Sequence, residues 1–428
     1  MRAYIFVLMF VSYLPLIFVT PFVGAMLWCW VSVMSPHEMT YDFLPFSYAA
    51  VVAGLFFLSL LVSPERKFPP NTAVTWAMAG LIVFATLAQV TAFDPIMSYP
   101  RWDTTWKGLL LSLLTMPLLN SRLRIHAFVW IIVLSLGYFG LKGGIWTFMT
   151  GGVWSVGGVS GMIGDNNHLA TALVLVLPLM VYMAIHSAQR IIRIGAAAMA
   201  FFTMVATLFT YSRGGMLALA ASLSVLWWRS SKKAVTGIGV LAFAVVAVQF
   251  APDALWARLG TIQNYELDGS ATGRLDIWRV ALTLASQHPL AGIGFHGTTL
   301  PALVGSIDQN VRPRAIHNSY IEVLTEAGLP AFLCHVTLYV ATLFYLRRIR
   351  RLTRNLPDWK WAFELASMMQ VSVVGYAVGS FFLSLGFYDG WWFVVITATA
   401  LDLHVRQSLG ARSKELSSSA ANFRTYPA

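Results

Sequence analysis

Long apolar stretches separated by short polar connections run along the whole chain. A helix that crosses a lipid bilayer needs about 20 mostly apolar residues, within a range of about 17–25. Stretches of this kind predict transmembrane helices at 46–64, 72–92, 105–120, 124–142, 167–187, 193–211, 214–229, 234–251, 328–346, 363–386 and 389–404. The pattern is that of an all-α polytopic membrane protein.

The first apolar stretch, residues 1–35, is too long for one straight crossing, and Pro15 and Pro21 interrupt it near its middle. Its path decides the topology, because cytoplasmic loops are enriched in Lys and Arg and the connection at 65–67 is basic. Counting back from that connection through 46–64, an odd number of crossings within residues 1–35 places Arg2 in the cytoplasm. We therefore expect one broken or re-entrant crossing here and about 12 transmembrane helices in all, with both ends in the cytoplasm. Thirteen helices is the alternative.

One connection on the outer side, residues 252–327, is far longer than an ordinary loop and carries helical patterns of its own. It is the one soluble-like piece that is large enough to form a site. The expected parts are 1–251 with transmembrane helices 1–9, 252–327 as one large, partly helical periplasmic loop with catalytic residues, 328–404 with helices 10–12, and 405–428 as a cytoplasmic tail.

The composition indicates a membrane protein and limits the classes of partner that it could bind. Hydrophobic residues make up 57% of the chain and charged residues only 11%, whereas a soluble chain carries roughly 25% charged residues. The net charge of +11 does not indicate a nucleic-acid partner, because the basic residues lie in short clusters between apolar segments. The two cysteines, Cys29 and Cys334, have neither disulfide nor metal spacing. The first apolar stretch lacks a small-residue cleavage pattern and is expected to be an anchor.

Arginines on the predicted outer side need an explanation other than topology, because outer loops are normally poor in Lys and Arg. They are Arg101, Arg213, Arg258, Arg274, Arg279, Arg312 and Arg314. An anionic ligand would account for them. Arg213 is followed by Gly214 and Gly215, which let a ligand approach the backbone closely. Its alternative role is that of an interfacial arginine whose side chain reaches into the headgroup layer.

Arg274 is expected in the first turn of a helix, with Thr272 as its N-cap. A cation is disfavoured there by the helix dipole unless an anion shares the site. The residues alone leave open whether that anion is a phosphate-bearing ligand or the carboxylate of Asp276.

His317 is expected just ahead of another helix, because Ser319 and Glu322 have the spacing of a capping box and the helix would run to Gly328. The helix dipole and nearby arginines would keep its imidazole neutral at pH 7, so that it can accept a proton as a general base. An ordinary polar loop residue is the alternative.

Two other outer positions carry polar groups, each with a structural alternative. Asp165 and His168 stand at the start of a predicted helix, where they could bind sugar hydroxyls or cap the helix. Asp389 lies in a tight predicted turn. The outer carboxylates are scattered, so the sequence indicates neither a metal site nor a cofactor.

Three ordered motifs resemble the O-antigen ligase family, whose relatives include O-antigen polymerases and protein O-oligosaccharyltransferases. They are Ser212-Arg213-Gly214-Gly215, the stretch from Gly273-Arg274 through Trp278 to His288-Pro289-Leu290-Ala291-Gly292-Ile293-Gly294, and His317-Asn318-Ser319-Tyr320 followed by Glu326-Ala327-Gly328-Leu329. The resemblance covers roughly 160–335. The stretch 164–170 is similar to a subgroup of O-glycosylation ligases associated with exosortase systems, which leaves the acceptor open.

The resemblance implies an inverting, metal-independent glycosyltransferase without cofactor. It would move a glycan from undecaprenyl diphosphate to lipid A–core, at the periplasmic face of the bacterial inner membrane, in lipopolysaccharide synthesis. When the functional residues of that family are matched to this sequence, the expected catalytic residues are His317, Arg213 and Arg274. The residues expected to contact substrate are Arg312, Arg314, Asn318, Tyr211, Asp165, His168 and Asp389. The expected partners are the lipid-linked donor, lipid A–core and membrane lipids.

Two other readings remain open. The first keeps the chemistry but changes the acceptor, to a growing polysaccharide or a protein side chain. The second, from a different class, is a lipid-oligosaccharide flippase or other transporter. A transporter would hold ionisable groups near the bilayer midplane and show two matched halves, whereas here they gather at one face and in one loop.

Overall fold

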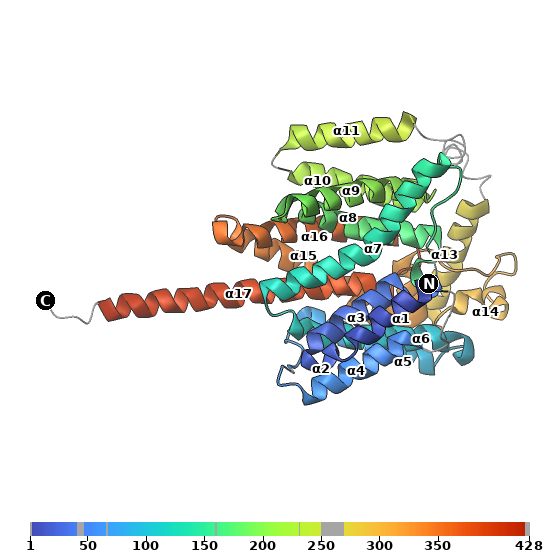
Figure 1. Ribbon diagram of the computed structural model, residues 1–428. Helices are drawn as coiled ribbons and strands as arrows, with labels where there is room; N and C mark the ends of the chain where they lie inside the picture. Colours follow the sequence, from blue (N-terminus) through green and yellow to red (C-terminus); the bar gives the residue numbers. More distant parts are fainter. Residues whose placement is uncertain are drawn as a thin grey trace.

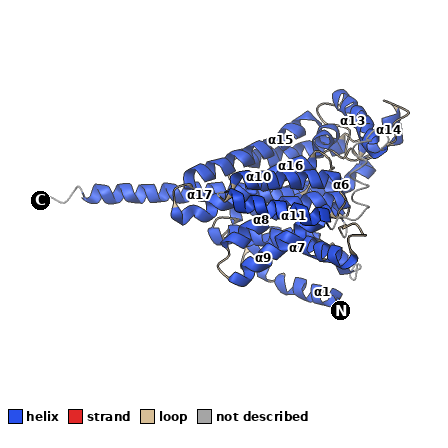
Figure 2. Cartoon of the chain, turned by 90° about the horizontal axis from the view of Figure 1, so that it is seen from above, coloured by secondary structure: helices blue, strands red, loops and turns tan. Residues whose placement is uncertain are grey.

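The computed structural model describes residues 2–40, 47–65, 67–158, 161–230, 232–249 and 269–423. Within these ranges every regular element is a helix (Figure 2). The elements, in chain order, are α1 (Arg2–Tyr13), α2 (Leu16–Val19), α3 (Pro21–Met34), η1 (Glu38–Thr40), α4 (Tyr48–Val62), α5 (Ala73–Val90), α6 (Pro95–Thr115), η2 (Met116–Leu118), α7 (Arg122–Thr150), η3 (Gly161–Ile163), α8 (Asn166–His186), α9 (Arg190–Leu208), α10 (Arg213–Arg229), α11 (Lys233–Gln249), α13 (Gly269–Gln287), η5 (Gly297–Thr299), α14 (Pro301–Gly305), α15 (Ser319–Thr353), η6 (Pro357–Trp359), α16 (Lys360–Ser380) and α17 (Asp389–Phe423).

Six described helices are long and apolar enough to cross a membrane. They are α5, α7, α8, α9, α15 and the stretch Pro357–Ser380. Shorter apolar helical stretches occur at Ala3–Val19, Pro21–Met34, Tyr48–Val62 and Lys233–Val245. The all-helical membrane fold is therefore confirmed, while the count of about 12 crossings stays a prediction.

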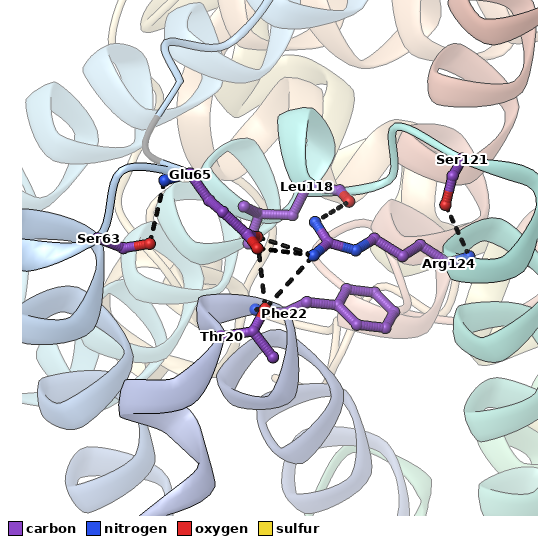
Figure 3. A network of polar contacts seen from close by, with 7 residues as sticks. All are labelled: Thr20, Phe22, Ser63, Glu65, Leu118, Ser121 and Arg124. Carbon is purple, nitrogen blue, oxygen red and sulfur yellow. Dashed lines mark hydrogen bonds and ion pairs between the residues drawn. The ribbon is translucent and has the colours of Figure 1, made fainter.

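The path of residues 1–35 differs from the expected single crossing, because the chain reverses at Thr20. Thr20 is extended, and its hydroxyl accepts a hydrogen bond from the backbone N–H of Phe22 (3.3 Å), which starts α3. The same hydroxyl donates to Glu65 (3.3 Å), and Arg124 donates to Glu65 (2.8 Å), so this turn lies beside the basic connection at 65–67 (Figure 3).

The other end of α1 lies far from this turn. The ring of Phe6 lies 5.1 Å from that of Tyr48, at the opposite end of α4 from Glu65. Both overall views place the N-terminus at the same end of the bundle as α13 and α14, and the C-terminus at the other end (Figures 1 and 2). Whether α1 and α3 each cross the membrane, and so the choice between twelve and thirteen crossings, stays a prediction.

Several helix boundaries also differ from the predicted ones. The predicted connection between 92 and 105 is mostly helical, because the Asp94 carboxylate accepts hydrogen bonds from the N–H groups of Ile96 and Met97 and caps α6, which begins at Pro95 instead of 105. Helix α7 continues to Thr150. The predicted tail at 405–428 continues α17 as helix to Phe423, and 424–428 lie outside the described residues.

The described part of the long loop forms a small helical unit with its own core. Residues from α13, α14 and their connections pack together: Ile277, Val280, Leu284, Ile293, Leu303, Val304 and Val311. Helix α13 contacts α15, so the unit rests on the end of the bundle. Arg258 and the rest of 252–268 lie outside the described residues.

Candidate functional site

The start of α15 is fastened to the connection between α16 and α17, although not by the predicted capping box. Asn318 is the N-cap, and its side-chain oxygen accepts hydrogen bonds from the N–H groups of Tyr320 (3.0 Å) and Ile321 (3.2 Å). Ser319 instead donates to the carbonyl of Leu383 (2.6 Å), and Glu322 accepts from the N–H of Gly386 (3.1 Å). The capping-box prediction is wrong because a distant segment engages both of its members.

His317 sits immediately before this cap, in the left-handed region (φ 53°), which few non-glycine residues adopt. Its backbone N–H donates to the hydroxyl of Ser384 (3.0 Å), which anchors it to the same connection. Its side chain is partly buried, and Nδ1 has no hydrogen-bond partner among the described residues. Nδ1 is thus a buried polar atom that no described protein group satisfies.

The surroundings of His317 favour its neutral form. Burial lowers the pKa of His317 below its ordinary value, the positive charge of Arg274 lowers it further, the carboxylate of Asp165 opposes this, and Arg314 adds a smaller lowering. The expectation of a neutral imidazole is confirmed in direction, with burial as the largest cause. The same contributions bring four predicted site residues, His317, Arg274, Arg314 and Asp165, into one neighbourhood.

Helix α13 brings Arg274 and Arg314 together. A Cβ atom at Gly273 would collide with the guanidinium of Arg314, so that side chain lies directly on the residue before Arg274. The indole N–H of Trp278 donates to the carbonyl of Ile316 (2.7 Å) and fastens α13 to the segment that carries His317.

Two expectations about α13 are wrong. The helix begins at Gly269, so Thr272 is not its cap and Arg274 is not in the first turn. Asp276 forms a long ion pair with Arg279 (3.9 Å), and Arg279 also pairs with Asp308 (3.0 Å).

The start of α8 adds Asp165 and His168. The Asp165 carboxylate accepts hydrogen bonds from the N–H groups of Asn167 (2.8 Å) and His168 (3.3 Å), so its capping role is confirmed. Nε2 of His168 is buried and has no hydrogen-bond partner within the described ranges. The charges of His168 and His317 interact, which places this second imidazole beside the first.

Arg213 is the first residue of α10, after Ser212, whose hydroxyl accepts from the N–H of Gly215 (3.1 Å). Gly214 packs tightly against Phe382, and Gly215 against Ala170 of α8. These contacts bring the start of α10 to the segments that carry His168 and Ser384. The backbone therefore places Arg213 at the same end of the bundle as His317.

Besides Asn318, whose side chain caps α15, three predicted substrate-contacting residues are engaged elsewhere or stand apart. Tyr211, also left-handed (φ 56°), donates its hydroxyl to the carbonyl of Gly152. Asp389 accepts from the hydroxyl of Ser32 and lies against Gly108, so it joins α17 to α3 and α6. Arg312 is exposed on the loop before His317.

Sequence reasoning gave no role to a second layer of charge beneath His317. Glu322 and Glu326 are each 4% exposed, and the charge of Arg101 interacts with both. One Glu326 oxygen accepts from the N–H of His296 (2.9 Å), while the other is buried without a partner in the described part of the chain. Burial and the charge of Arg101 lower the pKa of His296. The available signals were Arg101 among the outer arginines and Glu326 within the third motif.

An apolar groove of about 530 Å³ runs between α15 and α16 and begins beside the site. Its lining residues are Tyr320, Val336, Tyr339, Leu343, Val373, Val374, Ala377, Val378, Phe381 and Phe382. Tyr320 follows His317 by three residues, and its hydroxyl donates to the carbonyl of Ala377 (2.9 Å). Phe382 also touches Gly214, so one end of the groove adjoins both His317 and the start of α10.

In the described ranges, His, Cys, Asp and Glu side chains form no group of three or more that could hold a metal. Metal independence remains an expectation.

Comparison with known families gives the site a context. Residues 198–336 match the family model described as O-antigen ligase, and residues 1–188 match a family of unknown function (DUF5935). A search of curated proteins gave no match. The first matched region contains Arg213, Arg274, His317 and the start of the groove. Members of the matched family are membrane proteins of the glycosyltransferase type, acting as O-antigen ligases or polymerases. Residues 198–336 therefore match an O-antigen ligase domain, which supports membership of that family.

Proposed function

We propose that the protein is an O-antigen ligase that transfers a glycan from undecaprenyl diphosphate to lipid A–core, without a metal ion, at the periplasmic face of the inner membrane. One observation carries the proposal. A partly buried histidine with an unpartnered ring nitrogen stands beside two arginines at the mouth of an apolar groove.

His317 is the general base in this proposal. Its lowered pKa keeps the imidazole neutral at pH 7, so its unprotonated ring nitrogen can accept the proton of the acceptor hydroxyl. The hydroxyl oxygen then forms a bond to the anomeric carbon from the face opposite the leaving group, which inverts that centre. The bond from the anomeric carbon to the diphosphate oxygen breaks, and its electron pair leaves with the diphosphate.

Arginines stabilise the charge that develops on the diphosphate. Guanidinium groups form paired, charge-assisted hydrogen bonds with phosphate oxygens and can serve where a metal would otherwise act. The positive charges of Arg274 and Arg314 interact with His317. Arg213 is the first residue of α10, whose start packs against Phe382 and Ala170. The proton taken up by His317 returns to water after the product leaves.

The groove between α15 and α16 supports a lipid-linked donor. A polyprenyl chain is apolar and would lie against the aromatic and aliphatic lining, while its diphosphate would reach His317 and the arginines. The ionisable site groups gather at one end of the bundle, which favours an enzyme over a carrier with charged groups at mid-membrane.

The acceptor decides between ligase, polymerase and protein O-oligosaccharyltransferase. Purified protein is given undecaprenyl-diphosphate-linked glycan with lipid A–core, free glycan and a peptide as competing acceptors. The proposal expects product on lipid A–core alone. Product only on glycan or only on peptide would replace the ligase by the corresponding relative, and donor that crosses a vesicle membrane without product would favour the flippase.

A further inference from the structure

A cavity lined mainly by arginines lies at the other end of α15. It has a volume of about 760 Å³ and is lined by five arginines and two phenylalanines: Arg347, Arg348, Arg350, Arg351, Arg354, Phe344 and Phe363. From Gly328 to Arg350 the helix rises roughly 33 Å at about 1.5 Å per residue, close to the thickness of a bilayer core of about 30 Å. The cavity is therefore a site separate from that of His317, at the opposite end of the bundle (Figure 1).

Membrane topology alone does not require that the cations lining this cavity are all arginines. The positive-inside rule asks only for basic residues near the cytoplasmic end of a helix and is indifferent to whether they are Lys or Arg. Here all five cations that line the cavity are arginines, the side chain whose planar fork matches phosphate oxygens. Converging guanidinium groups repel one another unless an anion lies among them.

The interior contacts of the cavity hold guanidinium groups in place. Arg350 donates to the side-chain oxygen of Gln370 (3.0 Å), and Arg229 donates to the same oxygen. Two cations thus share one neutral acceptor. The Nε of Arg350 is buried and has no hydrogen-bond partner among the described residues. Arg348 pairs with Asp402 (2.7 Å), which also accepts from Arg406 (2.9 Å).

One face of α15 is apolar along the helix and cationic at the helix end, as an amphiphilic lipid is. Val340, Phe344, Arg347, Arg351 and Arg354 follow one another at spacings of three and four residues and so share a helix face. Val340 is 62% and Phe344 58% exposed, and the three arginines beyond them are also exposed. Apolar surface on the membrane side thus continues directly into cationic surface at the helix end.

We infer that this cavity binds the phosphate headgroup of an anionic phospholipid, whose acyl chains lie along Val340 and Phe344. Basic pockets between transmembrane helices on the cytoplasmic side are suited to such headgroups. The inference concerns the other end of the bundle from His317 and does not depend on the glycosyltransferase proposal.

The test uses the full chain purified in detergent and titrated with phosphatidylglycerol, with phosphatidylcholine and inorganic phosphate as separate arms. The readout is the thermal-unfolding midpoint, which gives an apparent Kd for each ligand. The variant Arg347→Gln/Arg351→Gln/Arg354→Gln removes three exposed charges and leaves Arg348 and Arg350 in place. The matched control Arg190→Gln/Arg193→Gln/Lys233→Gln removes three exposed charges near the same end of the bundle, outside the cavity.

Phosphatidylglycerol should raise the unfolding midpoint of the wild type saturably, and phosphatidylcholine should not. If each arginine contributes a factor of about five, the cavity variant should weaken the apparent Kd roughly 100-fold, and the control less than about threefold. Equal weakening in the two variants, or an equal response to phosphatidylcholine, would overturn the inference. An equal response to inorganic phosphate would overturn the assignment to a lipid.

Discussion

The substitution Gly273→Ala separates activity from stability at the site. Gly273 lies inside α13, where alanine is favoured over glycine by about 1 kcal/mol. The added Cβ would collide with the guanidinium of Arg314, the far end of a flexible side chain, which can move away by about 1 Å. Displacements of that size at catalytic groups cost up to roughly 100-fold in rate. We expect transfer to fall about 10- to 100-fold while the unfolding midpoint stays the same or rises slightly.

The assay is single-turnover glycan transfer, paired with thermal unfolding in detergent. Gly195→Ala is the matched control, because Gly195 also lies within a helix, α9, and a Cβ there meets nothing within 4 Å. It should keep full activity. In the Arg314→Ala background, Gly273→Ala should lower the rate no further, since its effect passes through Arg314. Wild-type activity in Gly273→Ala, or additive losses in the double variant, would refute the reasoning.

Three further predictions concern the residues around the base. Transfer should be constant above about pH 7 and should fall as the pH drops below about 6.5, the ordinary value for histidine, because protonation of His317 removes the base. Arg274→Gln removes a charge that lowers the pKa of His317, so the acidic fall should move to higher pH; an unmoved pH–rate profile would contradict this coupling. Asn318→Ala should destabilise the protein by about 1 kcal/mol through loss of the α15 cap, measured as a lower unfolding midpoint, and unchanged stability would argue against the cap.

Hydropathy was enough to predict the helical membrane fold, because bilayer-spanning helices carry their signal within one segment. Local signals also marked the breaks at Pro15 and Pro21, and the break at Gly328, where α15 has non-helical backbone (φ 83°, ψ 173°). The direction of the chain after such a break was not predictable. The reversal at Thr20 depends on Glu65 and Arg124, which are distant in sequence.

The candidate site, too, was predictable only where its signal lies within one short segment. The motifs gave His317 and Arg274, because each lies in a short pattern, and the arginines on the predicted outer side included Arg314. Asn318 and Ser319 are both competent N-caps, and only the distant carbonyl of Leu383 decides which one caps α15.

The second layer around Arg101 shows the limit of local reasoning more clearly. It depends on the charge of Arg101, on α6, meeting those of Glu322 and Glu326 on α15, and on Phe387, over which the Arg101 guanidinium lies at 6.0 Å. No spacing within a single segment encodes that meeting.

The most direct measurement is single-turnover transfer by His317→Ala, with and without added imidazole. If an uncharged imidazole removes the proton of the incoming alcohol, this variant should fold normally and transfer at least about 100-fold more slowly, and free imidazole should restore part of the rate. His404→Ala, at the opposite end of the bundle beside Trp359, is the control and should keep its rate. Transfer by His317→Ala within about threefold of wild type would contradict the account.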